Sequence, residues 1–166
     1  MKPSLIVYYS LTGNVADTVQ KIAKEIDADT LELFPKAAYP DEGVRKFLWG
    51  GKSAVMGEEP TLEPYEFDGE KYDRIIFASP VWAGTFAPPL RTFIRANREA
   101  LAGRIYAAVL CHGGAGADLA LKKLRQELGL GQWQASVVLV DPKDRPSEEN
   151  EQRLKAFYKE LEFMAY

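Results

Sequence analysis

The sequence predicts an α/β fold: a doubly wound, five-stranded parallel sheet in the order 2-1-3-4-5, with helices on both faces. Three observations predict it. Short apolar runs alternate along the chain with segments whose apolar residues recur at helical spacing. The runs 5–9 and 75–78 are apolar at odd and even positions alike, which is typical of strands covered on both faces. Several runs end in small or polar residues, at the point where open α/β sheets bind ligands.

The first strand leads into the stretch 10–14, which reads Ser-Leu-Thr-Gly-Asn. Ser10 and Thr12 offer hydroxyl donors, and Gly13 lets the backbone come close to a ligand. We expect Asn14 to cap the helix that follows, whose first N–H groups have no internal partner. Free N–H groups and a favourable helix dipole predict a phosphate site here, the alternative being an ordinary capped turn.

Charge around this stretch bears on how an anion would be held. No Lys or Arg occurs between Lys2 and Lys21, so neutral donors would hold a bound phosphate.

The residues after this stretch predict a helix of about three turns packed on the sheet, because their apolar members recur at helical spacing. They are Val15, Val19, Ile22, Ala23 and Ile26.

Residues 30–34 alternate like a strand nearer the edge of the sheet, and Pro35 ends them. The connection that follows, residues 36–71, is irregular and rich in Gly and Pro. A short helix is expected within it, carrying Val44, Phe47 and Leu48. So long an irregular connection usually has a function or wraps the surface.

The third strand, residues 72–79, ends in a loop that holds Trp82, Gly84 and Phe86. We expect Trp82 to contact a ligand at the sheet edge, the alternative being a side chain that plugs the loop into the core. The prolines at 88–89 suit the first turn of the next helix. The core face of that helix is predicted to consist of Leu90, Phe93, Ile94 and Leu101.

The fourth strand, residues 105–110, precedes a loop with three glycines, residues 111–116. The spacing does not match the dinucleotide fingerprint G-x-G-x-x-G, because Leu119 stands at its last position. We expect Asp118 to cap a helix that Gly129 ends. That helix is predicted to present Leu121, Leu124 and Leu128 to the core.

The first two residues of this loop are a cysteine and a histidine, Cys111 and His112. Cys111 is expected to be a small buried residue, because no second cysteine exists to resolve it in a redox cycle. His112 either hydrogen-bonds a ligand or caps local backbone. Residues 134–140 predict the fifth strand, and residues 146–149 open the last helix with acidic side chains that suit the helix dipole.

In the predicted strand order, the loops after strands one, three and four meet at one edge of the sheet. They bring together hydroxyl donors, an indole ring and backbone amides of glycines. FMN, with a phosphate at one end and a flat heteroaromatic ring at the other, is a ligand that satisfies all three. Trp82 would stack on the ring or cover its edge.

The sequence resembles the flavodoxin family, and in particular its branch with a Pro-Val-Trp-x-Gly-Thr loop after strand three. Residues 10–14 resemble the family's phosphate loop, Ser/Thr-x-Thr-Gly-Asn, and residues 79–85, followed by Pro88-Pro89, match the branch. The resemblance implies one flavodoxin-like domain over residues 1–166, a three-layer sandwich that binds FMN non-covalently. The cofactor-binding residues it implies are Ser10, Leu11, Thr12, Gly13, Asn14 and Val15 for the phosphate, with Pro80, Val81, Trp82, Ala83, Gly84, Thr85, Cys111, His112, Gly113, Gly114 and Gly116 for the ring.

The resemblance implies a redox function, in one of two forms. The favoured form transfers electrons through the flavin to a redox partner protein or a small acceptor. The alternative is an enzyme that reduces a quinone or another small acceptor with NAD(P)H. A flavin-free receiver module of the same topology is set aside, because it needs carboxylates where Ser10 and Ser79 stand. No catalytic side chain is assigned.

Composition excludes other classes. A net charge of −3 and a pI of about 5.3 argue against a nucleic-acid partner. A single Cys and a single His allow no intramolecular disulfide and give no support to a metal site. The first apolar run is too short for a signal peptide or a membrane span, so cytoplasmic residence is expected. The oligomeric state is not predicted.

Overall fold

The computed structural model describes residues 3–39, 52 and 56–163. Its centre is a sheet of five parallel strands in the order β2-β1-β3-β5-β6, which confirms the doubly wound order expected from the sequence. A short further strand, β4, pairs antiparallel with the end of β3. The strands are β1 (Ser4–Tyr8), β2 (Asp29–Glu32), β3 (Arg74–Trp82), β4 (Thr85–Phe86), β5 (Ile105–His112) and β6 (Ala135–Val140).

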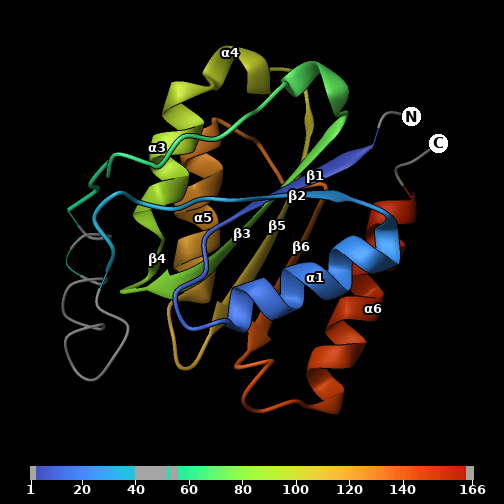
Figure 1. Cartoon of the computed structure of the whole chain (residues 1–166). Coiled ribbons are helices and arrows are strands. Elements are labelled where there is room, and N and C mark those ends of the chain that lie inside the picture. The colour runs from blue at the N-terminus through green and yellow to red at the C-terminus, as the bar shows by residue number, and fades with distance from the viewer. Residues whose placement is uncertain (1–2, 40–51, 53–55, 164–166) are drawn as a thin grey trace.

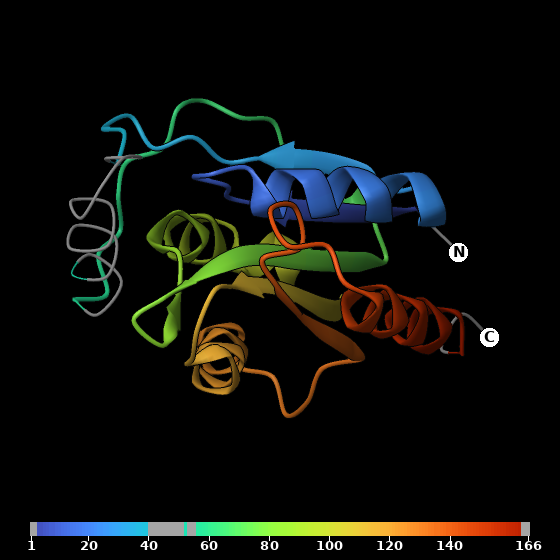
Figure 2. The same ribbon diagram turned by 90° about the horizontal axis from the view of Figure 1, so that it is seen from below.

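Helices cover both faces of this sheet and complete a three-layer sandwich (Figure 2). Helices α1 and α6 lie on one face, and α3, α4 and α5 lie on the other (Figure 1). They are α1 (Asn14–Ile26), α3 (Pro88–Ala96), α4 (Arg98–Leu101), α5 (Ala117–Leu128) and α6 (Glu148–Phe163), with a 3-10 turn η1 (Gly69–Lys71) before β3.

Each face of the sheet has its own apolar core, and β1 contributes to both. Ile6 and Tyr8 face α1 and α6, whereas Leu5 and Val7 face the opposite layer. All four side chains are buried. This double coverage explains why the first apolar run does not alternate. Each fully buried aliphatic side chain stabilises the fold by about 1.5–3 kcal/mol, so β1 holds the three layers together.

The helical stripes predicted from the sequence face these cores. Buried in their helices are Val15, Val19 and Ile22 of α1, Leu90, Phe93 and Ile94 of α3, and Leu124 of α5. Helix α6 also has a buried stripe, which consists of Leu154, Phe157 and Leu161. Helix α5 ends at Gly129, which has a φ of +69°, as predicted. Leu101 is buried too, but it lies in the separate short helix α4.

The second strand is shorter than predicted, because the chain leaves the sheet to pair with the returning end of the long connection. Pro35 forms an antiparallel bridge with Leu62. The N–H of Glu63 donates to the carbonyl of Phe34 at 2.7 Å. The described end of this connection then covers α3, where the Thr92 hydroxyl donates to the Pro60 carbonyl at 2.7 Å. The short helix expected at Val44, Phe47 and Leu48 lies outside the described residues.

The outer strand β6 is bonded to α6 along its free edge. Asn150, which is 4% exposed, accepts the N–H of Val140 at 3.0 Å and donates to the carbonyl of the same residue at 2.8 Å. Arg153 donates to the carbonyl of Val138 at 2.9 Å. The Ser147 hydroxyl accepts the N–H of Asn150 at 3.1 Å. These bonds fix the place where the chain leaves β6 and turns towards α6.

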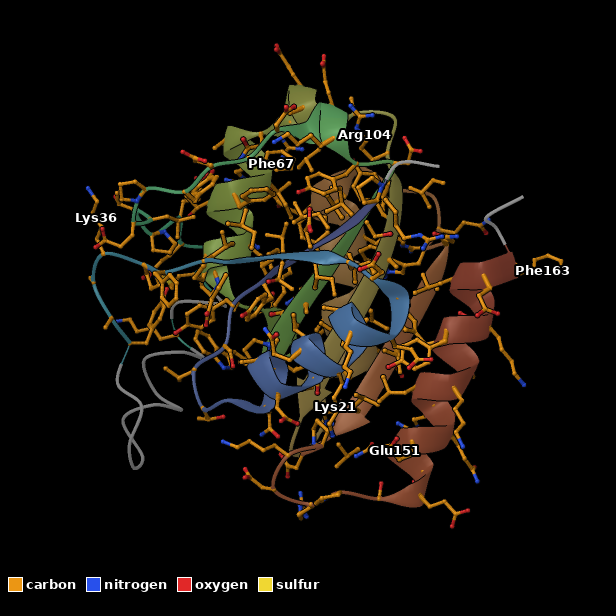
Figure 3. All side chains as sticks on the ribbon, turned by 45° about the vertical axis from the view of Figure 1, so that its right-hand side comes forward. Lys21, Lys36, Phe67, Arg104, Glu151 and Phe163 are labelled. Carbon is orange, nitrogen blue, oxygen red and sulfur yellow. The ribbon has the colours of Figure 1, made fainter. Side chains whose placement is uncertain are left out.

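Side chains crowd between the sheet and its helices, whereas Phe163 projects from the end of α6 (Figure 3). No helix among the described residues combines the length and the apolar character that crossing a membrane requires.

Candidate functional site

A cleft of about 680 Å³ opens at the carboxyl-terminal edge of the sheet, where the chain leaves β1, β3 and β5. Its volume lies in the range of small-molecule and cofactor sites. The predicted site residues that line it are Ser10, Leu11, Thr12, Asn14, Val15, Pro80, Val81, Trp82, Ala83, Cys111, His112, Gly113 and Gly114. Four other predicted residues, Gly13, Gly84, Thr85 and Gly116, shape the surrounding turns without lining the cleft.

The turn between β1 and α1 is built differently from the prediction. Gly13, with a φ of +99°, is the residue that precedes the helix, and Asn14 is already helical, so the prediction that Asn14 caps α1 is wrong. The Ser10 hydroxyl oxygen accepts the N–H of Ala16 at 3.1 Å instead. The other N–H groups of the first turn have no intrahelical partner by helix geometry, which leaves them available to an anion.

A lysine reaches this turn from a distant part of the chain. The N–H of Lys143, in the loop between β6 and α6, donates to Asn14 Oδ1 at 3.0 Å. Its Nζ lies 2.8 Å from the position that a Cβ atom would take at Gly13. A positive charge therefore lies beside the turn, although no Lys or Arg occurs between Lys2 and Lys21; which groups hold a bound phosphate stays a prediction. Figure 2 shows this loop, in orange-red, beside α1.

The stretch after Ser79, predicted as a loop, is a β-hairpin. Strand β3 continues to Trp82, and β4 returns beside it. The two turn residues, Ala83 and Gly84, have φ values of +50° and +72°, the signs that a tight hairpin turn requires. Thr85 is 1% exposed in β4 and does not line the cleft, so its predicted contact with a cofactor stays a prediction.

Ser79 holds the base of this hairpin. Its side chain is fully buried, its hydroxyl oxygen accepts the N–H of Ala87 at 2.8 Å, and its hydroxyl donates to the Pro80 carbonyl at 2.8 Å. The hydroxyl therefore satisfies main-chain groups on both sides of the hairpin, and this fixes the path by which Trp82 reaches the cleft.

Trp82 is both a lining residue of the cleft and a member of an aromatic cluster. Its ring centroid lies 5.6 Å from that of Tyr9 and 5.2 Å from that of Tyr39, and both pairs meet edge to face. Tyr9 and Tyr39 also contact one another at 6.0 Å. Such packing restricts the rotamer of the indole. A cofactor in the cleft would thus meet an aromatic wall that is already in place.

The loop after β5 begins later than predicted, because Cys111 and His112 are the last residues of the strand. Gly116, with a φ of +95°, precedes α5, and Asp118 lies in the first turn, so the predicted Asp118 cap is wrong. A Cβ atom at Gly113 would lie 3.1 Å from Asp141 Oδ1. The Nδ1 atom of His112 is buried and has no hydrogen-bond partner among the described residues.

The hairpin and the β5 loop touch through two glycines. A Cβ atom at Gly116 would lie 2.9 Å from Gly84 Cα, and a Cβ atom at Gly84 would lie 3.1 Å from Leu119 Cδ2. Both residues have positive φ, which L side chains rarely adopt. The two glycines therefore set the spacing of the hairpin and the β5 loop beside the cleft.

The sequence model of the family described as NADPH-dependent FMN reductase matches residues 9–142, which span all three loops of the cleft. The chain belongs to this family. Members bind FMN on a flavodoxin-like fold, so the cofactor and the fold expected from the sequence are confirmed at the level of the family. The individual contacts of this FMN reductase family member with a cofactor stay predictions.

Solved structures of flavoproteins share its fold. A putative flavoprotein from Bacteroides eggerthii is 17% identical with a TM-score of 0.75, and the match covers 100% of this chain and 99% of that one. A flavoprotein in complex with FMN from Lactobacillus acidophilus is 22% identical with a TM-score of 0.70, over 87% and 96%. A Fusobacterium nucleatum flavodoxin bound to flavin mononucleotide is 13% identical with a TM-score of 0.57, over 98% of each chain.

Sequence reasoning missed four residues that the fold of this family member adds to the site. Asp141 and Asp144 line the cleft, Lys143 lies over the β1–α1 turn, and Tyr39 packs against Trp82. The first three lie in one loop, Asp-Pro-Lys-Asp-Arg, which follows an apolar strand as the other site loops do. The position of this loop directly after an apolar strand could have indicated that it belongs to the site.

Cys111 should be inert to iodoacetamide in the folded protein. Burial raises the pKa of its thiol to about 12, so little of the reactive thiolate exists near neutral pH. Its Sγ lies 3.8 Å from Thr18 Oγ1, inside the core. Mass spectrometry after timed alkylation checks this: labelling is expected only in denaturant, and rapid labelling of the native protein would contradict it.

Proposed function

We propose that this protein binds FMN non-covalently in the cleft and functions as a redox protein that transfers electrons through it. The proposal rests on one observation: three features line the same cleft. They are the start of α1 with its unpaired N–H groups, the indole of Trp82, and the glycines that follow β5. Fold class alone would not specify a flavin, since the same topology serves many functions.

The phosphate would lie at the start of α1. There the Thr12 hydroxyl and the unpaired N–H groups of the first turn can donate to phosphate oxygens, and the helix dipole favours the negative charge. The Ser10 oxygen already accepts one N–H group, which leaves its hydroxyl hydrogen for an acceptor. The donors therefore fit a phosphate group.

The ring would lie between the hairpin and the β5 loop. Trp82 offers an aromatic surface, and Gly113 and Gly114 expose backbone without side chains. The buried Nδ1 of His112, unpaired within the described part of the chain, would gain a partner if a ring heteroatom came within reach. Such an orphaned polar atom beside an aromatic wall fits a flat heterocycle with polar edges.

When bound, FMN supplies the electron-accepting and electron-donating chemistry, and the protein supplies binding, orientation and electrostatics. The β1–α1 turn would fix one end of the cofactor. The Tyr9–Trp82–Tyr39 cluster would exclude water from one side of the cleft, because its rings pack edge to face. No side chain of the described residues is required to form a covalent bond in this function.

Two forms of this function differ in the reductant. In the first, a partner protein or another external donor reduces the flavin, and the protein passes the electrons on. The second is reduction of a quinone or another small acceptor with NADPH. The second form is supported by the description of the matching family, NADPH-dependent FMN reductase.

The test begins with apo-protein titrated with FMN and with riboflavin, followed by quenching of flavin fluorescence. Saturable binding of FMN and a yellow protein are expected. The absence of binding with excess FMN would refute the proposal. NADPH is then added to the FMN-loaded protein without oxygen, with and without a quinone. Rapid bleaching and turnover identify the reductase, whereas bleaching by dithionite alone identifies the carrier.

A further inference from the structure

The loop between β6 and α6 places a positive charge beside the β1–α1 turn, whose own donors are neutral. We propose that the Lys143 ammonium binds the phosphate group of the cofactor and makes the protein prefer FMN over riboflavin in a salt-dependent way. This inference rests on the proposed function, because it assigns a residue to the phosphate end of the same cleft.

The position of Lys143 is fixed by its main chain. Its N–H donates to Asn14 Oδ1 at 3.0 Å, so one side chain of the β1–α1 turn holds the β6–α6 loop in place. Inside the loop, the N–H of Arg145 donates to the Asp141 carbonyl at 2.8 Å, and the N–H of Asp141 donates to the His112 carbonyl at 2.9 Å. The loop is thereby tied to the first residue of α1 and to the last residue of β5.

The ammonium group is aimed at the turn that would hold the phosphate. Its Nζ lies 2.8 Å from the Cβ position of Gly13, so a side chain at that residue would have to displace the lysine. Gly13 therefore has two roles: it permits a φ of +99°, and it leaves room for the lysine. A phosphate bound by the first N–H groups of α1 would lie beside this ammonium.

The charges nearby leave Lys143 available. Among the described residues, no carboxylate oxygen lies within 4.0 Å of its Nζ. Asp141 is paired with Arg145, and Asp17 in the first turn of α1 is 3.6 Å from Lys21. Asp144, which lines the cleft, is the carboxylate that opposes an anion there. A cation without a carboxylate partner in the described part of the chain, next to helix N–H groups that have no intrahelical partner, indicates an anionic ligand.

The expected effect is moderate, because Lys143 is exposed and salt screens it. Lys143→Met should weaken FMN binding about tenfold in about 0.01 M salt, and the loss should shrink to about twofold in about 1 M salt. Riboflavin, which has no phosphate, should bind the variant and the wild type equally. Lys143→Arg should retain the salt dependence.

Lys159→Met is the matched control. It removes the same charge from an exposed site on α6, about 16 Å along the helix from its start. Its FMN affinity and salt dependence should match the wild type. A loss in this variant equal to that of Lys143→Met would show a net-charge effect and overturn the proposal.

Asn14→Ala tests the positioning step. If Asn14 holds the loop, the Lys143→Met substitution should cost less FMN affinity in the Asn14→Ala background than in the wild type. Equal losses in the two backgrounds would show that Asn14 does not position the lysine.

All affinities are measured by flavin fluorescence titration of apo-protein whose folding is checked by circular dichroism. Equal FMN affinity and equal salt dependence in wild type and Lys143→Met would overturn the inference and leave the FMN site intact. Equal loss of FMN and riboflavin would also overturn it, since the lysine would then act on the fold. A wild type that binds neither flavin would refute the proposed function itself.

Discussion

Replacing Thr12 and Asn14 together by alanine should weaken FMN binding about a hundredfold. Both side chains line the phosphate end of the cleft, and a hydrogen bond to a charged group contributes about 1.5–3 kcal/mol. Two such bonds correspond to at least two powers of ten in affinity. Riboflavin binding should change little, because the ring is proposed to lie between the hairpin and the β5 loop and not at this turn. Fluorescence titration with both flavins measures the ratio.

Thr30→Ala, on the exposed edge strand β2, serves as a control and should bind both flavins like the wild type. An equal loss of FMN and riboflavin in the double variant would mean that the turn itself had collapsed. Unchanged FMN affinity would place the phosphate elsewhere. The single variants separate two roles, because Asn14 also accepts the N–H of Lys143 whereas Thr12 makes no such contact with that loop.

Gly116→Ala should lower the free energy of unfolding by about 2–5 kcal/mol. Its φ of +95° is strained for an L residue by about 1–2 kcal/mol. The new Cβ atom would also lie 2.9 Å from Gly84 Cα, which is backbone and cannot rotate away. Overpacking of this kind costs about 1–3 kcal/mol. Urea denaturation of the apo-protein measures the change.

Gly114→Ala, in the same loop, is the control for that substitution. A Cβ atom at Gly114 would have no heavy atom within 4 Å, and its φ is not positive. Its free energy of unfolding should stay within about 0.5 kcal/mol of the wild type. Similar stability in the two variants would show that the hairpin and the β5 loop do not rely on the contact between Gly84 and Gly116.

The sequence predicted the sheet and the position of the cleft because both follow from short-range patterns. An apolar run without alternation, such as residues 75–78, requires coverage on both faces, and parallel strands must then present their carboxyl ends at one edge. Ser10 and Trp82 each follow such a run, so their meeting in one cleft could be inferred.

The errors arose where main-chain geometry or distant contacts decide the structure. Asn14 and Asp118 were predicted to cap their helices, but each helix is preceded by a glycine whose positive φ turns the chain into it. The hairpin after β3 was missed because its turn uses Ala83 at positive φ instead of the usual Asn-Gly signal.

Lys143 shows the second source of error. Its contact with Asn14 joins residues that are 129 positions apart, and no periodicity along the chain records such a pairing. The loop that carries it could be placed near the cleft from the strand order. Its direction could not, because that depends on how α6 docks against β6.

The bonds between α6 and the outer strand have a consequence for self-association. An uncovered strand at the end of a sheet exposes main-chain donors and acceptors that can recruit a strand from another molecule. Here Asn150 occupies both groups of Val140, and Arg153 occupies the carbonyl of Val138. Intermolecular strand addition at this end would first have to displace those two side chains, which protects the protein against aggregation along this edge.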